Sequence, residues 1–133
     1  MAIDPRGVTE WFAGFLDTYG ACGRGDRDIA ALLPFYGVPM LLTSDEGFVV
    51  LDSEDAVAAA MQGQLDGLRA AGYHHTDMVH GEVTVLNATS ALYRTSLSRV
   101  RADGQELQGV AVSYVLTEGP RGLQISVLAA HSP

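Results

Sequence analysis

Hydrophobic residues change their spacing once along the chain, and that change predicts the order of the secondary structure. Apolar residues recur every three or four positions in residues 11–33 and again in residues 57–68, which is the period of an α-helix. From residue 73 to residue 130, apolar and polar residues alternate in long runs rich in Val, Thr and Tyr, as β-strands do. This segregation predicts an α+β fold, with helices on one face of a strongly curved, mostly antiparallel sheet.

Polar residues at the starts of the helical segments predict three helices in the N-terminal half. Thr9 is the expected N-cap of the first helix, Asp26 of a short second helix, and Ser53 of the third and longest. Pro5 is interpreted as a breaker, so residues 1–7 are expected to form a short arm.

Turn residues divide the remaining sequence into six strands without any linker or internal repeat. The predicted strands are residues 38–43, 48–51, 73–86, 91–100, 107–117 and 123–130. We therefore expect residues 1–133 to form a single domain with one core.

The composition excludes several classes of function. The 133 residues are 47% hydrophobic and carry a formal net charge of −8, with no basic run, which argues against nucleic-acid binding and against docking on anionic membranes. Cys22 is the only cysteine, so an intrachain disulfide cannot form. The first thirty residues contain no long apolar run, so neither a signal peptide nor a membrane span is expected, and a cytoplasmic protein is the default.

Two motifs connect this order of elements to a known family. An aromatic-rich helix runs into a Gly-Asp pair in FLDTYGACGRGD, residues 15–26, and LPFY, residues 33–36, precedes the first strand. With these motifs the chain resembles the nuclear transport factor 2-like superfamily, which includes ketosteroid isomerases and SnoaL-type polyketide cyclases. The resemblance implies a cone-shaped, cystatin-like roll whose interior holds a small apolar ligand and whose open sheet face forms a homodimer.

The positions that carry chemistry in ketosteroid isomerases hold other residues in this sequence. By the resemblance, the aspartate base matches Leu42, the oxyanion tyrosine matches Thr18 beside Tyr19, and the protonated acid falls around Val112 or Ser113. Proton transfer at carbon needs a base within reach of the proton and donors for the enolate oxygen. The resemblance therefore implies a pocket without isomerase chemistry.

The densest polar cluster lies at the start of the strand predicted at residues 73–86. On a regular strand His74 and His80 share one face while His75 and Asp77 share the other, so no face offers three metal ligands and no metal is expected. His75 and Asp77, with Tyr93 from the next strand, are the candidate catalytic residues; otherwise the histidines lie at the mouth of the sheet or in a dimer contact. No cofactor motif is present in the sequence, and no cofactor is expected.

Aromatic residues of the N-terminal half supply most of the expected pocket wall. The predicted lining consists of Trp11, Phe15, Tyr19, Tyr36, Met61 and Tyr93. Arg94 and Arg99 fall on opposite faces of the strand at residues 91–100, and Arg99 shares a face with Tyr93. An arginine facing inward would hold a carboxylate ligand, whereas one facing outward, the commoner case, is a solvated or interface charge.

Three functions remain open at this level. The first is a protein that binds a small apolar molecule without catalysis. The second is a cofactor-independent isomerase, cyclase or hydratase that uses His75, Asp77 or Tyr93 in a rearranged site. The third is a structural interaction domain, which predicts a filled or very small cavity.

Overall fold

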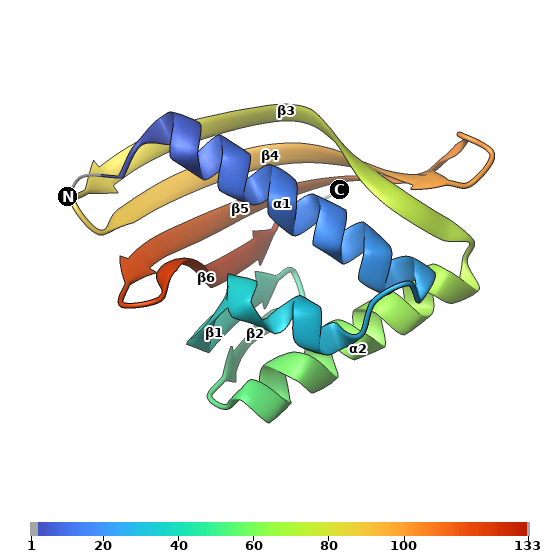
Figure 1. The fold of residues 1–133 in the computed structure, drawn as a ribbon, viewed down its shortest axis with the longest axis horizontal. Helices are drawn as coiled ribbons and strands as arrows, with labels where there is room; N and C mark the ends of the chain where they lie inside the picture. Colours follow the sequence, from blue (N-terminus) through green and yellow to red (C-terminus); the bar gives the residue numbers. More distant parts are fainter. Residues whose placement is uncertain (1–2, 133) are drawn as a thin grey trace.

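The computed structural model describes residues 3–132, which form one curved six-stranded sheet with its helices (Figure 1). The elements in chain order are α1 (Pro5–Arg24), the 3₁₀ turns η1 (Ile29–Ala31) and η2 (Leu33–Phe35), β1 (Tyr36–Ser44), β2 (Gly47–Leu51), α2 (Glu54–Ala70), β3 (Tyr73–Asn87), β4 (Ser90–Arg101), β5 (Glu106–Gly119) and β6 (Gly122–Ala130). The predicted α+β fold is confirmed, and the six expected strands each form within two residues of their predicted bounds.

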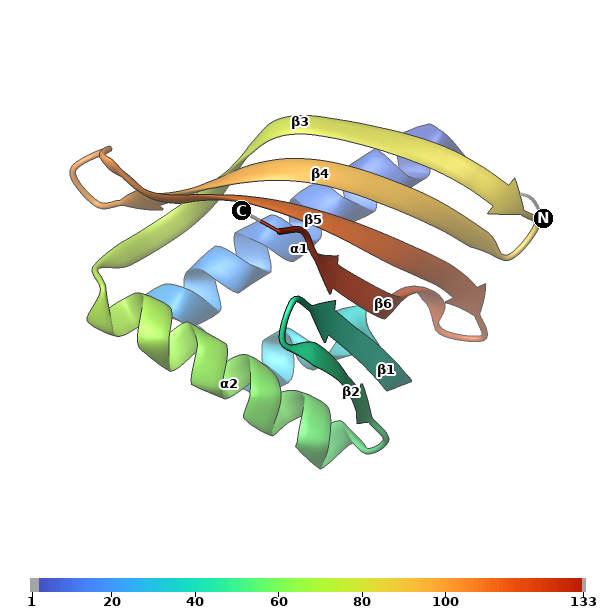
Figure 2. The same ribbon diagram turned by 180° about the vertical axis from the view of Figure 1, so that it is seen from behind.

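The sheet is mixed, with the strand order β2-β1-β6-β5-β4-β3. Every neighbouring pair is antiparallel except β1 and β6, which run parallel. The long strands β3, β4 and β5 arch over α1, and α2 lies nearer to the short hairpin of β1 and β2 (Figures 1 and 2). The described helices therefore cover the inner face of the arch and not its outer face.

The first helix begins earlier than the sequence pattern predicts. Its N-cap is Asp4, whose side chain accepts a hydrogen bond from the backbone N–H of Arg6 at 3.2 Å, and Pro5 is its first residue. The prediction of Thr9 as the cap, and of Pro5 as a breaker, is wrong because a proline at the first helical position loses only an N–H that has no intrahelical partner. The Thr9 hydroxyl instead donates to the Pro5 carbonyl oxygen.

The other two helix starts give one correction and one confirmation. The segment expected to form a second helix consists of two 3₁₀ turns, and its cap is Asp28 rather than Asp26. Ser53 caps α2 as predicted, because its hydroxyl accepts a hydrogen bond from the backbone N–H of Ala56 at 3.1 Å.

Aromatic side chains of α1 fix the helix on the sheet. The ring of Phe12 meets the edges of Tyr93 on β4 and Tyr114 on β5, with ring centroids 4.8 and 4.9 Å apart. Such edge-to-face pairs stabilise packing by about 0.5–1.5 kcal/mol beyond the apolar area that they bury. Tyr93 also lies over Gly81 of β3, where any Cβ would come within 2.8 Å of the phenol oxygen, so a side chain there would clash with Tyr93.

One end of the roll is left open by the unequal lengths of β5 and β6. Pairing between the two strands covers only Val112–Gly119 of β5, so among the described residues 106–111 have a strand partner on the β4 side alone. A single further hydrogen bond joins the His131 N–H to the Ala111 carbonyl oxygen. The free half of β5 borders the opening that leads into the interior.

Candidate functional site

A pocket of about 680 Å³ lies between the inner face of the sheet and the two α-helices, and it reaches the surface beside the free half of β5. Its lining residues are Phe15, Leu16, Tyr19, Tyr36, Gln64, Thr76, Val79, Ser96, Leu97, Arg99, Glu106, Gln108, Gly109, Val110, Ala111, Val112, Tyr114, Leu128, Ala130, His131 and Ser132.

The middle of the pocket is apolar. Phe15 of α1 forms its aromatic floor together with Tyr114, whose ring centroid lies 6.3 Å away. Val112 on β5 and Leu128 on β6 continue this wall toward the opening. An apolar molecule that enters this space gives up contact with water on most of its surface, which is the main source of affinity in such sites.

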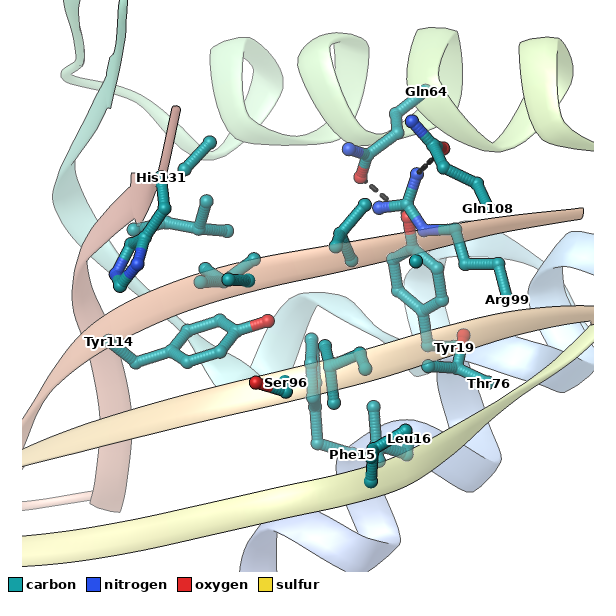
Figure 3. Close-up of a pocket in the computed structure, with 18 of the residues that line it drawn as sticks. Phe15, Leu16, Tyr19, Gln64, Thr76, Ser96, Arg99, Gln108, Tyr114 and His131 are labelled. Atoms are coloured by element: carbon teal, nitrogen blue, oxygen red, sulfur yellow. Dashed lines mark hydrogen bonds between the residues drawn. The ribbon is translucent and has the colours of Figure 1, made fainter. Parts of the chain in front are cut away.

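Four polar side chains gather at one end of the pocket, and we call them the polar cluster: Tyr19 from α1, Gln64 from α2, Arg99 from β4 and Gln108 from β5 (Figure 3). The Tyr19 hydroxyl donates to the Gln64 Oε1 atom at 2.6 Å. The Arg99 Nη1 atom donates to the Gln108 Oε1 atom at 3.3 Å. Four elements that are distant in sequence thus place one hydrogen-bonding group each at the same site.

Arg99 is the only arginine or lysine among the lining residues that the structure describes. Its side chain is half-buried and faces inward, and it forms no ion pair with any described acidic side chain. Of the two orientations that the sequence allows for an arginine on this strand, the structure has the inward one for Arg99. Arg94, by contrast, is exposed.

Three tyrosine hydroxyls add hydrogen-bond donors to the interior. Burial raises the pKa of Tyr19, Tyr36 and Tyr114 well above the usual value of a phenol, so all three stay protonated. Tyr36 is 2% exposed, and its hydroxyl is the buried side-chain polar group without a hydrogen-bond partner in residues 3–132. Such a group costs about 1–3 kcal/mol of stability, so it calls for an explanation.

Two titratable side chains complete the described lining, His131 and Glu106. His131 lies across the pocket from Arg99 (Figure 3), and its Nε2 atom is 2.7 Å from the Ser113 hydroxyl. Glu106 lies at the end of the polar cluster, because it pairs with Val100 of β4, the residue after Arg99. It is exposed, and its Oε2 atom accepts a hydrogen bond from the Ser98 hydroxyl at 2.6 Å. Glu106 is the only carboxylate among the described lining residues.

The structure places the six residues expected to line a pocket in two groups. Phe15, Tyr19 and Tyr36 line the pocket described above. The other three belong to the surrounding packing and are Trp11, Met61 and Tyr93. Trp11 stacks on the outside of Phe15, whereas Met61 and Tyr93 are buried in the core.

The candidate catalytic residues do not meet in one place. His75 and Asp77 are paired, with the Nε2 and Oδ1 atoms 3.3 Å apart, but neither lines the pocket. Tyr93 pairs with Val83 of β3, six residues beyond Asp77 and therefore about 20 Å along the strand. Irregular pairing at the start of β3 also brings the Nδ1 atoms of His74 and His75 to 2.9 Å, although a regular strand would separate them.

The residues at the ketosteroid isomerase positions do not all reach the pocket. Thr18 donates its hydroxyl to the Gly14 carbonyl oxygen within α1, while its neighbour Tyr19 lines the pocket. Leu42 is half-buried outside the described lining, and Val112 lies inside it. The tyrosine that reaches the interior is thus one residue beyond the matched position, which is a turn of about 100° around the helix.

Comparison with known proteins assigns the family. A model of the NTF2-like proteins designated DUF6841 matches residues 4–133. The chain belongs to this family. The resemblance to the nuclear transport factor 2-like superfamily is confirmed. None of the curated proteins matches the chain.

Solved structures agree with this NTF2-like assignment at the level of the fold. A protein of unknown function with a cystatin-like fold from Nostoc punctiforme is 10% identical, with a TM-score of 0.72 over 98% of this chain and 94% of that one. An NTF2-like protein from Novosphingobium aromaticivorans is 18% identical, with a TM-score of 0.66 over 92% and 80%. An NTF2-like protein of unknown function from Shewanella oneidensis is 16% identical, with a TM-score of 0.68 over 93% and 98%. At these identities the likeness concerns the fold alone.

Sequence reasoning missed two of the four residues of the polar cluster in this NTF2-like protein. Gln64 follows the buried Met61 by three positions on α2, so its place on the helix was a usable signal. Gln108 shares a face with Val110 and Val112 on β5, but its partner Arg99 lies on another strand. A glutamine does not by itself indicate a binding site, so neither residue could be recognised before its neighbours in space were known.

No group of three or more His, Cys, Asp or Glu side chains in residues 3–132 is placed to hold a metal ion. Over the same residues, no helix is both long enough and apolar enough to cross a membrane.

Replacing Tyr36 by Phe should stabilise the ligand-free NTF2-like protein. The change removes a buried hydroxyl that has no partner, so we expect the free energy of unfolding to rise by about 1 kcal/mol. Tyr19→Phe is the matched control, because it removes a hydroxyl that donates to Gln64, and it should lower the same quantity by about 1 kcal/mol. Urea unfolding of both variants measures the two values. A loss of stability in Tyr36→Phe equal to that in Tyr19→Phe would contradict the assignment of the unpartnered hydroxyl.

Proposed function

We propose that this NTF2-like protein binds a small, mainly apolar molecule in its interior pocket and carries out no ketosteroid isomerase chemistry. The observation that carries the proposal is the pocket itself, which has a volume of about 680 Å³ and an aromatic and aliphatic middle. Pockets for small organic ligands usually measure about 300–1,000 Å³ and combine apolar walls with a few convergent polar groups. A purely structural domain would have filled this space with side chains.

The polar groups of the pocket support binding rather than proton transfer at carbon. No residue of β1 supplies a carboxylate, and Glu106 is exposed and hydrogen-bonded to Ser98. The buried phenols of Tyr36 and Tyr114 keep their protons and can donate, but they cannot act as bases near neutral pH. His131, the other titratable group, has its Nε2 atom 2.7 Å from the Ser113 hydroxyl and lies across the pocket from the polar cluster. The polar cluster therefore offers donors without a base among them.

The alternative function, an isomerase, cyclase or hydratase acting through His75, Asp77 and Tyr93, receives no support from their placement. None of the three lines the pocket, and the His75–Asp77 pair is about 20 Å along β3 from Tyr93. We therefore favour the binding protein.

We also propose that two copies associate through the outer face of the sheet. Strand pairing aligns five apolar side chains in one row across that face, from β4 to β2: Leu92, Val115, Val127, Leu41 and Val50. Neither of the described α-helices covers this face (Figure 2). A row of apolar residues of this length is self-complementary under a two-fold axis, and its burial by a second copy would remove it from water.

Binding in the pocket can be tested with the neutral dye Nile red. We expect saturable binding with one site per chain and an increase in dye fluorescence, because the dye moves from water into the apolar middle of the pocket. Ala130→Trp places an indole at the opening and should weaken the affinity about tenfold or more. Ala59→Trp, on the exposed side of α2, should leave it unchanged. Unsaturable binding, or equal affinity in all three proteins, would remove the proposal.

No isomerase activity above background is expected with an androstenedione-type substrate. A general base contributes about 10²- to 10⁴-fold to such a rate, and Leu42 stands at the family position of that base. Ultraviolet absorbance of the conjugated product follows the reaction. Clear conversion that disappears in Tyr19→Phe would show that the pocket does catalyse this reaction.

A homodimeric mass is expected by light scattering at micromolar protein concentration. Val115→Glu places a charge in the middle of the apolar row and should yield a monomer. Val85→Glu is the control, because Val85 is 39% exposed and pairs with the inward-facing Ala91, away from the row. A monomeric mass of the unmodified protein, or dissociation by the control variant alone, would contradict the arrangement.

A further inference from the structure

The polar cluster presents hydrogen-bond donors and a positive charge to the pocket. The Gln64 Oε1 atom already accepts from Tyr19, and the Gln108 Oε1 atom already accepts from Arg99. The NH₂ groups of these two side-chain amides therefore remain available to donate to a ligand. Arg99 carries five N–H donors and uses one of them on Gln108. The groups that remain are N–H donors, so the complementary ligand is an acceptor.

Charge selects among the possible acceptors. Arg99 is the one arginine or lysine of the described lining, and no described carboxylate pairs with it. Glu106 pairs with Val100, the residue after Arg99, and its carboxylate would repel a ligand with a high negative charge at this end of the pocket. A single planar guanidinium matches the geometry and the charge of one carboxylate, which accepts two parallel hydrogen bonds from it.

A second observation, independent of the cluster, comes from Tyr36. This side chain lines the same pocket, is 2% exposed, and holds a hydroxyl without a partner in the described residues. Buried hydroxyls are normally hydrogen-bonded. An unpartnered hydroxyl that lines a pocket therefore indicates that a bound ligand accepts its hydrogen bond. Ligand oxygen atoms would serve this donor as they serve the cluster.

We propose that the ligand of this pocket is an organic monocarboxylate with a large apolar body, and that Arg99 of the polar cluster holds its carboxylate. The proposal rests on the pocket being a binding site, and it adds the chemical class of the ligand. The apolar body lies along Phe15, Val112 and Leu128, and the carboxylate faces Arg99 and the amide groups of Gln64 and Gln108.

Two fluorescent probes that differ only in their polar group test the proposal. 1-Pyrenebutyrate carries a carboxylate at pH 7, whereas 1-pyrenebutanol has the same ring and chain with a neutral hydroxyl. We expect the unmodified protein to bind the acid about 10- to 100-fold more tightly than the alcohol, which is the range for a charge-assisted hydrogen bond in a partly buried site. Equal affinity for the two probes would overturn the proposal. Failure of both probes to bind would instead overturn the binding function itself.

Arg99→Met and Arg94→Met form a matched pair of variants. The two arginines lie on the same strand and lose the same charge, but Arg99 lines the pocket and Arg94 is exposed outside it. Arg99→Met should abolish the preference for the acid and leave the affinity for the alcohol unchanged, whereas Arg94→Met should keep the preference. An equal loss in both variants would assign the effect to the net charge of the protein and would overturn the role of Arg99.

Gln108→Glu provides a test that preserves the shape of the site. The new carboxylate would lie beside the Arg99 guanidinium, in place of the amide oxygen that now accepts its hydrogen bond, and would neutralise it. The affinity for 1-pyrenebutyrate should fall by about the same factor as in Arg99→Met. An unchanged acid affinity in a folded Gln108→Glu protein would also overturn the proposal.

Discussion

The packing of Phe15 is the contact on which the rest of the structure depends. Its ring lies within 5.3–6.4 Å, centroid to centroid, of six other aromatic rings, which are those of Trp11, Phe12, Tyr19, Phe35, Tyr36 and Tyr114. On one side this cluster continues into the closed core between α1 and the sheet. On the other side Phe15 forms the floor of the pocket, so the same ring belongs to both the core and the pocket wall. Losing such a ring would cost about 3–5 kcal/mol and would also remove the floor.

The chemistry of the pocket follows from what this packing leaves outside the core. The helices α1 and α2 and the strands β4 and β5 each place one polar group beside the aromatic cluster, and together these groups form the polar cluster around Arg99. Arg99 forms no ion pair with any described acidic residue, and the one acidic side chain of the described lining, Glu106, accepts a hydrogen bond from Ser98. In a chain with a net charge of −8, the described lining of the pocket thus keeps one arginine. The donors, the charge and the apolar middle of the pocket are together complementary to one class of ligand, an amphipathic carboxylic acid.

Much of the fold could be predicted from the sequence because strand and helix periods are local properties. Alternation placed Tyr93 and Arg99 on one face of β4, and that face is the inner one. Two kinds of error had physical causes. Pro5 suits the first position of a helix as well as it suits a break, and a pattern of apolar residues does not distinguish the two. The one-residue offset between Thr18 and Tyr19 turns a side chain by about 100°, which no count along the sequence resolves.

The site itself could be predicted only in part, because its residues come together through long-range pairing. Tyr19 and Gln64 are 45 positions apart in the sequence, and the contact between them exists only once α1 and α2 have packed. The most direct test of the account is a crystal structure of the protein with 1-pyrenebutyrate bound. The account predicts the carboxylate at about 2.7–2.9 Å from the Arg99 guanidinium, with the pyrene ring against Phe15. A probe that lies with its carboxylate in solvent, or a ring bound anywhere outside the pocket, would contradict it.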